Sequence, residues 1–368
     1  MYEEILNNIN TVIEYKEGDK LSPINKSYFS KPISKDNFHV ITNTPILATK
    51  LCFIDGGSSE LLKAPNFSLF FIRIYANITQ NNKTISDKKV EFYCLAKTKV
   101  KDDKLFYEVE LFIDKNENRE KNEEVIKYLP DKEDLELYSF DKTIVIGENR
   151  AEISKIGDIA RRFAEIKLAT EVINTENENH GLDHDDIIIL DGNLRATYTN
   201  EDKYFNELYE TASSKNILVT GLCKTSNLLT EKGNNIINVL QHLSPEGNWY
   251  YHPIIEINEP KHNAEMMFVK LNTASEYIFR FEIHKQHLTN DLEFNNKVNE
   301  ILNLLIKNSN DYSFPGYPYG LVKADEFARI SNQEKQYLKS KILFTLKKEN
   351  NINACLKALD AHDVLDGK

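Results

Sequence analysis

Two aspartates, each followed by glycine, are the residues of this chain that first point to chemistry. Asp55 ends an apolar stretch and precedes a glycine-rich segment with two serine hydroxyls, and Asp191 ends a second apolar stretch. Asp-Gly is a common turn dipeptide, so one occurrence alone indicates only a turn. Because the pattern comes twice, we expect two buried strands that each end and turn at the aspartate. Two carboxylates at neighbouring strand ends can hold divalent cations, which prefer oxygen ligands.

The composition indicates a folded protein with a sizeable core and an acidic surface. Of 368 residues, 41% are apolar and 28% are charged, and the formal net charge is −11. This charge argues against a general nucleic-acid-binding surface, which needs clustered lysine and arginine. It leaves room for a local basic groove, or for a metal site that itself supplies positive charge. No stretch has the length of a membrane span, and the acidic N-terminus lacks a signal-peptide pattern, so we expect an intracellular, cytoplasmic protein without membrane association.

The four cysteines are widely separated and form no CxxC pair. Three of them lie in apolar, strand-like surroundings; the four are Cys52, Cys94, Cys223 and Cys355. Buried free thiols are therefore expected, rather than disulfides or a zinc site.

The order of predicted elements changes from antiparallel strands to alternating helix and strand. Apolar periodicity predicts an N-terminal helix, then a loop or arm, four strands, a charge-dense solvated insertion, and alternating helices and strands that imply parallel pairing. The ranges are 1–16 for the helix, 17–44 for the arm, 45–55, 67–76, 90–95 and 105–113 for the strands, 114–141 for the insertion, and then 155–173, 186–191, 201–213 and 217–221. Residues 222–262 are looser, 266–271 and 277–283 are further strand candidates, and amphipathic helices are predicted around 294–305, at 321–330 and after Ser331.

Four carboxylates fall at the places where an RNase H-like fold holds its metal ligands. In that fold one carboxylate ends the first strand, one projects from the first helix, one ends the fourth core strand, and a later helix brings a fourth side chain. Asp55, Glu165, Asp191 and Asp325 occupy these places in order. Taken singly, each is better explained as a cap, a turn or an ion pair. As an ordered set they predict a metal centre on an α/β fold, an RNase H-like mixed sheet flanked by helices with N- and C-terminal helical extensions.

From about residue 45 to 330 the chain resembles the NurA nucleases. No single motif is specific, but the order and spacing of six motifs together are. They are Phe53-Ile54-Asp55-Gly56-Gly57-Ser58, Arg161-Arg162-Phe163-Ala164-Glu165, Ile189-Leu190-Asp191-Gly192-Asn193-Leu194, Val219-Thr220-Gly221-Leu222-Cys223-Lys224-Thr225, Phe279-Arg280-Phe281-Glu282, and Gly316-Tyr317-Pro318-Tyr319-Gly320-Leu321 before Ala324-Asp325. We accordingly expect an N-terminal helix and arm at 1–44, a nuclease domain at 45–330 and a C-terminal helical segment at 331–368.

The resemblance implies a manganese-dependent nuclease, with Mg²⁺ as an alternative ion, that resects DNA ends in double-strand break repair. It further implies a homodimer docked on a hexameric HerA-type DNA translocase. Phosphodiester hydrolysis would use two divalent ions held by Asp55, Glu165, Asp191 and Asp325. Two positions depart from the family pattern: Asp325 stands where a histidine is usual, and Asn193 replaces the commoner serine. A carboxylate at 325 can bind a cation but cannot act as an imidazole acid or base.

Four further residues are candidates for holding DNA, each with an ordinary structural alternative. Lys224 follows a strand and is placed to contact a phosphate, or it is a loop lysine. Arg280 pairs with a phosphate or with Glu282. Tyr317 stacks on a base or ribose, as aromatics do in strand-binding channels, or it packs in the core. Arg161 contacts DNA or forms an i,i+4 ion pair with Glu165.

Three alternative interpretations compete with the nuclease. A phosphate-loop at 219–225 is excluded because glycine is missing at Leu218 and Cys223. His180 and His184 have the i,i+4 spacing of zinc ligands, but their polar surroundings favour a solvent-exposed loop. A non-catalytic DNA-binding or scaffold subunit on the same fold remains open, and metal binding separates it from the nuclease because a scaffold has no need of a metal.

Overall fold

The computed structural model describes residues 2–3, 5, 18–43, 49–114, 125–175, 181–287, 291–312 and 314–346. Its strands are β1 Tyr28–Ser30, β2 Phe38–Val40, β3 Lys50–Ala64, β4 Phe67–Gln80, β5 Lys83–Lys101, β6 Lys104–Phe112, β7 Leu137–Tyr138, β8 Ile187–Asp191, β9 Leu218–Cys223, β10 Trp249–Tyr251, β11 Ile255–Ile257, β12 Ala264–Lys270 and β13 Phe279–His284. Its helices are α3 Lys155–Asn174, α4 Glu201–Ser214, α5 Ile236–Leu243, α6 Asp291–Asn308, α7 Tyr319–Ala328 and α8 Asn332–Leu346, with short 3₁₀ turns at 35–37, 132–135 and 285–287.

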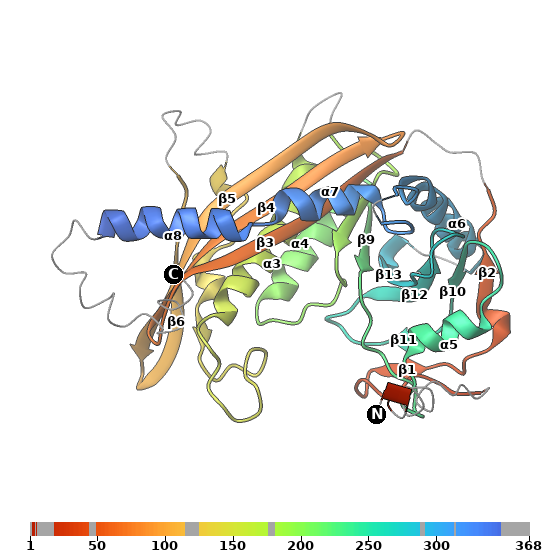
Figure 1. Ribbon diagram of the computed structural model, residues 1–368, viewed down its shortest axis with the longest axis horizontal. Helices are drawn as coiled ribbons and strands as arrows, with labels where there is room; N and C mark the ends of the chain where they lie inside the picture. Colours follow the sequence, from red (N-terminus) through yellow and green to blue (C-terminus); the bar gives the residue numbers. More distant parts are fainter. Residues whose placement is uncertain are drawn as a thin grey trace.

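Within this part of the chain, one 11-stranded mixed sheet runs through the molecule (Figure 1). Its centre has the strand order β9-β8-β3-β4-β5. Strands β3, β4 and β5 are antiparallel, whereas β8 runs parallel to β3 and β9 parallel to β8. Three antiparallel strands followed by two parallel ones on the other side of the first strand is the RNase H-like topology. The fold predicted from the order of elements is therefore confirmed.

The long hairpins form because their strands and turns agree. Strand β4 is rich in aromatic and β-branched residues, which pack well on a pleated surface. Asn81-Asn82 joins β4 to β5 and Asp102-Asp103 joins β5 to β6, and all four residues have positive φ. Two-residue turns with both φ values positive match the right-handed twist of the strands they join, and Asn and Asp tolerate that backbone region.

Helices cover both faces of the sheet, and the side-chain alternation of β3 assigns each face. Cys52 and Ile54 point into a core shared with α3 and α4, whereas Leu51 and Phe53 point into a second core shared with α6 and α7. A third core joins β1, α5 and β10 to β12. In Figure 1, α7 and α8 lie end to end across β3 and β4. Strand β3 thus contributes side chains to the first and second cores, on opposite faces of the sheet.

The expectation that the chain turns after Asp55 is wrong. Strand β3 continues through Gly56 and Gly57 to Ala64 and pairs with β4 over this whole length, with a bulge between Glu60 and Leu62. The glycines serve close packing instead of a turn. A Cβ at Gly56 would lie 2.5 Å from Glu165 Oε1, and one at Gly57 would lie 2.3 Å from the carbonyl oxygen of Ala328.

Other differences from the sequence predictions lie at the sheet margins. The predicted arm contains two short strands: β1 pairs with β11, and β2 forms an edge of the main sheet. The described part of the charged insertion is partly packed, with Tyr128, Leu135 and Leu137 buried. Region 222–262 holds α5, β10 and β11. These elements were not predicted because they are short and because the strands they pair with are distant along the chain. The predictions for most of 1–16, and those for 45–48, 115–124 and 347–368, lie outside the described residues.

Three of the four cysteines have the predicted state. Cys52, Cys94 and Cys223 are buried free thiols, and Cys355 lies outside the described residues. No helix in the described part of the chain is both long enough and apolar enough to cross a membrane.

We predict that Gly57→Ala destabilises the protein by about 1–3 kcal/mol, the usual cost of overpacking, because the added methyl collides with the Ala328 carbonyl and must push α7 away from β3. Thermal unfolding measures the effect. Ser59→Ala, two residues along the same strand, adds no atom and serves as the control. An unchanged melting temperature for Gly57→Ala would show that α7 does not need this close approach.

Candidate metal centre

Three aspartates from three elements meet at one end of the parallel strands. Asp55 from β3, Asp191 from β8 and Asp325 from α7 each offer a carboxylate oxygen, and these oxygens lie within 4.8 Å of one another. Asp55 is buried, and the other two are partly exposed. The structure therefore brings together three of the four carboxylates expected from the sequence, although they are far apart along the chain.

The position of each aspartate follows from the element that carries it. Asp55 sits beside the last residue of β3 that pairs with β8, since that pairing ends at Ile54. Asp191 ends β8, and Gly192, with a φ of +125°, turns the chain away from the sheet. Asp325 comes from α7, which packs on the face of the sheet opposite to α3. Gly320 of that helix packs so close to the Phe53 ring that a Cβ would lie 2.0 Å from it.

The ammonium of Lys224 lies among the three carboxylates. Its Nζ is 2.6 Å from Asp191 Oδ2, 2.9 Å from Asp325 Oδ1 and 3.8 Å from Asp55 Oδ2. Lys224 directly follows β9, the strand that pairs with β8, so the sheet register delivers it there. Lys224 is therefore more than an ordinary loop lysine, because its charge neutralises part of the cluster. Its contact with a phosphate stays a prediction.

Glu165 reaches the centre from α3, on the other face of the sheet. Its side chain is buried and pairs with Arg161 and Arg162 on the same helix. Gly56 leaves the space through which Glu165 and Arg161 approach β3, and Arg161 Nη1 donates to the Gly56 carbonyl over 3.3 Å. The expected ion pair between Arg161 and Glu165 is thus present, and Glu165 is adjacent to the three aspartates without belonging to the 4.8 Å group.

The electrostatics of the cluster favour binding of positive charge. Burial, and then the nearby carboxylates of Asp191 and Glu165, raise the pKa of Asp55 to about 9. Burial also raises the pKa of Glu165, against the opposing effect of its two arginines. Burial acts in the same direction on Asp325, but hydrogen bonds from Lys224 and Arg329 outweigh it and lower the pKa of that carboxyl. Without a bound metal ion, the Asp55 carboxyl is therefore protonated near neutral pH.

The donor set fits a hard divalent cation. Carboxylate oxygens are the preferred ligands of Mg²⁺ and Mn²⁺, and three of them converge from separate elements here. The position of the Lys224 ammonium shows that a cation is stabilised at this point of the structure. A metal bound by the same carboxylates would compete with that ammonium.

The remaining candidates from the sequence are placed less favourably for contact with a ligand. Tyr317 is fully buried, and its ring packs against Phe279 and Phe314, so it is a core residue; its hydroxyl lies 3.4 Å from Asp191 Oδ1. Arg280 Nε lies 3.2 Å from Glu282 Oε1, which is the ion pair of the structural alternative. His184 is exposed and pairs with its neighbour Asp185, while His180 lies outside the described residues.

Glu282 is a residue whose role the sequence analysis did not recognise. It is fully buried on β13, and its Oε2 accepts hydrogen bonds from the Leu194 amide at 2.8 Å and from His262 Nε2 at 2.9 Å. Beyond it, His262 Nδ1 lies 2.7 Å from the Tyr28 hydroxyl, which donates to Glu259. Glu282 therefore holds the loop that follows Asp191. The motif Phe279-Arg280-Phe281-Glu282 contained it, but no local pattern links a strand glutamate to a loop amide.

Two more contacts hold the same loop. Arg162 donates to the Asn193 carbonyl over 2.6 Å, and Gly192 donates to Leu222 on β9 over 3.0 Å. Gly221 on β9 permits this approach, since a Cβ there would lie 2.4 Å from the Gly192 carbonyl oxygen. The backbone after Asp191 is fixed from three directions, and the Asp191 carboxylate with it.

Residues 49–330 match the family model described as NurA domain. No curated protein sequence matches the chain. Among solved structures, it is similar to the catalytic domain of human Endonuclease V, with 8% identity, a TM-score of 0.38 and coverage of 80% of this chain and 84% of that one. It is also similar to Ciona intestinalis Endonuclease V bound to an inosine-containing DNA, with 10% identity, a TM-score of 0.36 and coverage of 76% and 84%. A third, Aquifex aeolicus Argonaute, has 11% identity, a TM-score of 0.28 and coverage of 77% and 28%.

We predict that Mn²⁺ binding releases a proton and tightens with rising pH. Because the Asp55 pKa is about 9, this carboxyl is protonated near neutral pH without metal and must lose the proton to bind one. Below that pKa the apparent affinity should rise about tenfold per pH unit, one proton being exchanged. Calorimetric titration in buffers of different ionisation enthalpy measures the released proton. Asp55→Asn, which has no proton to release, is the control; equal proton release by both proteins would contradict the assignment.

We predict that Glu282→Gln weakens Mn²⁺ binding about 10- to 100-fold, the usual effect of losing a residue that orients metal ligands. The amide keeps the volume of the side chain but loses the charge that holds the Leu194 amide and His262. Glu265→Gln is a matched control, because Glu265 lies on the neighbouring strand β12, pairs with His252 and does not touch the Asp191 loop. Equal affinities of both variants, at equal melting temperatures, would count against the positioning role.

Proposed function

This chain belongs to the NurA family of DNA nucleases, and we propose that it hydrolyses DNA at the centre formed by Asp55, Asp191 and Asp325, with Glu165 beside them. The observation that carries the proposal is the convergence of three carboxylate oxygens from β3, β8 and α7 within 4.8 Å. Asp191 ends β8, and Asp55 lies where the parallel pairing of β3 with β8 ends, so side chains from different elements converge there on one substrate.

The three aspartates would hold one or two divalent ions, with Mn²⁺ proposed as the preferred ion and Mg²⁺ as the alternative. Divalent ions supply positive charge to the phosphate and lower the pKa of water. The protein contributes a fixed arrangement of ligands. Glu165 is proposed to complete this set of ligands, and its ion pairs with Arg161 and Arg162 balance its negative charge.

Lys224 has two roles in this proposal. Without metal, its ammonium offsets the repulsion among the carboxylates. A metal bound by the same carboxylates would compete with the ammonium, and the charge of Lys224 would then be available to the substrate phosphate. Because Asp325 supplies a carboxylate and not an imidazole, proton transfer to the leaving oxygen is assigned to water. Arg161, 28% exposed, is proposed as a second phosphate contact, and Arg280 as a structural residue.

We also propose the wider setting that the family resemblance implies: 5′-end resection in double-strand break repair by a homodimer working with a hexameric HerA-type translocase. The net charge of −11 fits delivery of DNA by a partner better than capture by the outer surface. Helix α8 crosses β3 and β4 on the outside of the molecule and exposes Tyr337 and Phe344, which makes it a candidate for subunit contact.

We predict that Asp191→Asn lowers the rate of metal-dependent DNA cleavage at least about 100-fold, or ~2.7 kcal/mol of transition-state stabilisation, because it removes a ligand charge without changing volume. The assay uses end-labelled single- and double-stranded DNA with Mn²⁺, Mg²⁺ or EDTA, and the label pattern gives polarity. Asp202→Asn, at a partly exposed aspartate on α4 that pairs with Lys261, is the control.

Cleavage by Asp191→Asn at the rate of the unmodified protein would overturn the assignment of the centre. Absence of cleavage with every metal, both alone and with a HerA-type hexamer added, would overturn the nuclease proposal. That result would leave a non-catalytic DNA-binding or scaffold subunit on the same fold.

A further inference from the structure

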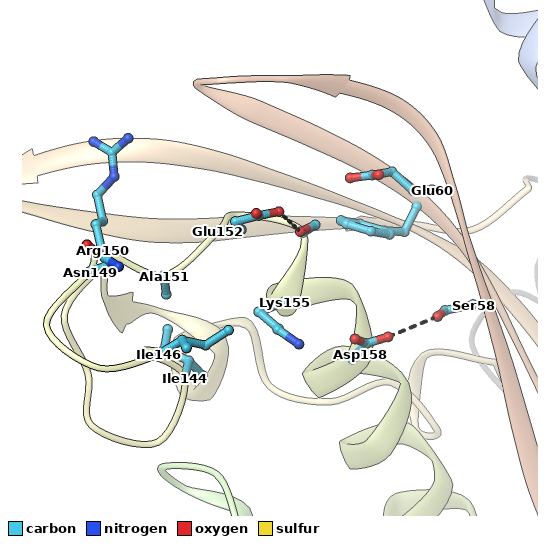
Figure 2. A pocket seen from close by; sticks show the side chains of 12 residues that line it. Ser58, Glu60, Ile144, Ile146, Asn149, Arg150, Ala151, Glu152, Lys155 and Asp158 are labelled. Carbon is cyan, nitrogen blue, oxygen red and sulfur yellow. Dashed lines mark hydrogen bonds between the residues drawn. The ribbon is translucent and has the colours of Figure 1, made fainter. Parts of the chain in front are cut away.

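A cavity of about 610 Å³ beside the first turn of α3 has the wrong charge for a DNA strand (Figure 2). Three carboxylates line it against two cations; they are Glu60, Glu152 and Asp158, and Arg150 and Lys155. A surplus of negative charge repels a phosphate backbone. The side of the metal centre that carries Lys224 is therefore the more favourable one for the rest of a bound strand.

Tyr277 lies at the same end of the sheet as the metal centre. Asp191 ends β8, and Lys224 follows β9. Strand β13 runs antiparallel to β9, with Arg280 opposite Cys223, so the residues just before β13 lie beside the residues just after β9. Tyr277 precedes the first residue of β13 by two positions. Its place at this end of the sheet follows from strand register.

Contacts between aromatic rings connect Tyr277 with the centre. The Tyr277 ring lies 5.0 Å from the Phe314 ring and 6.2 Å from the Phe279 ring, measured between centroids. Both of these rings pack against Tyr317, at 5.1 and 5.2 Å. The Lys224 ammonium lies 5.6 Å from the centroid of the Tyr317 ring. Two ring-to-ring contacts thus separate Tyr277 from the lysine at the metal centre.

The aromatic cluster is buried next to the centre and reaches the surface at Tyr277. Tyr317 is fully buried, whereas Tyr277 is 56% exposed. The sequence analysis offered Tyr317 as a ring on which a base could stack, but its burial leaves no free face. Tyr277 is the member of the same cluster that has one.

The exposed ring is held in place by its surroundings. Phe314 meets it edge to face, at an interplanar angle of 89°. The Tyr277 amide donates to Ser275 Oγ over 3.2 Å, and Asn272 Nδ2 fastens this segment to the Ser309 carbonyl over 3.3 Å. A ring fixed by its neighbours loses little conformational entropy when a ligand stacks on it.

The chemistry of this position suits a nucleobase. Every base has a face that stacks on an aromatic ring, whatever its sequence. Glu276, exposed beside Tyr277 in the chain, adds a negative charge, so the ring offers a face for a base and not a contact for a phosphate. A base inside a double helix is stacked between its neighbours, whereas a base of a single strand is free to turn onto the ring.

We propose that Tyr277 is a stacking site for a base of a single DNA strand whose phosphate lies at the metal centre. The strand passes Lys224 between the two positions, and the ring holds it without base specificity. The inference names single-stranded DNA as the substrate class of the centre. It rests on the proposed function for the identity of the ligand.

The test measures strand binding without cleavage. Fluorescence anisotropy, with Ca²⁺ in place of Mn²⁺, gives the affinity for a labelled oligothymidylate of about 30 nucleotides and for an abasic strand of the same length, over a series of salt concentrations. Tyr277→Leu removes the aromatic face but keeps an apolar side chain over Phe314, and Tyr277→Phe keeps the ring. Phe112→Leu is the control, at a 49% exposed ring on β6, three strands away from β3.

We expect Tyr277→Leu to bind the oligothymidylate about tenfold more weakly, and Tyr277→Phe and Phe112→Leu to bind it as the unmodified protein does. The slope of log affinity against log salt should stay the same in Tyr277→Leu, because no phosphate contact is lost. On the abasic strand, which has nothing to stack, Tyr277→Leu and the unmodified protein should have equal affinities.

An unchanged affinity of Tyr277→Leu for the oligothymidylate, or an equal loss on both strands, would overturn the inference. A changed oligomeric state of this variant in light scattering, with strand binding intact, would also overturn it and mark Tyr277 as a subunit contact. A loss confined to the strand that carries bases, in a protein that cleaves no DNA, would support this site while the proposed function fails. The two results are therefore separable.

Discussion

Repulsion among carboxylates brought into contact is the constraint on which this structure depends. Asp55, Asp191 and Asp325 lie within reach of one ion, and Glu165 stands behind them. Buried like charges at such distances cannot all ionise unless positive charge is present. Several groups offset this repulsion. They are a proton on Asp55, the ammonium of Lys224, and the guanidinium groups of Arg161, Arg162 and Arg329.

Holding these charges together requires backbones to approach more closely than side chains normally allow. Gly56 admits Glu165, Gly57 admits the end of α7, and Gly320 of α7 lies against Phe53. Strand β3 is therefore bare on both faces at the point where the centre forms. The packing that stabilises the fold and the geometry that forms the site are the same contacts, and a methyl group at any of these glycines disturbs both.

The sequence predicted the order of the central strands and the three aspartates that meet, because both depend on local patterns repeated in a known order. It failed where the cause lies elsewhere in the chain. Gly56 and Gly57 look like a turn until Glu165 and Ala328 are known to lie against them. The burial of Tyr317 depends on Phe279 and Phe314, and the position of Lys224 depends on strand register. Glu282 belongs to a motif that the sequence analysis quoted, yet its partner is the backbone amide of Leu194 in the loop after β8.

The centre is divided between the sheet and a helix near the end of the described chain. Asp55 and Asp191 belong to strands made early, whereas Asp325 arrives only with α7. The loop after α7 is then secured by Arg73, which contacts the Arg329 carbonyl and Glu334 of α8. During synthesis on the ribosome, a nascent chain that has not yet extended past α7 has an incomplete set of ligands. A protein that cuts nucleic acid thus gains its complete centre only after α7 has been translated.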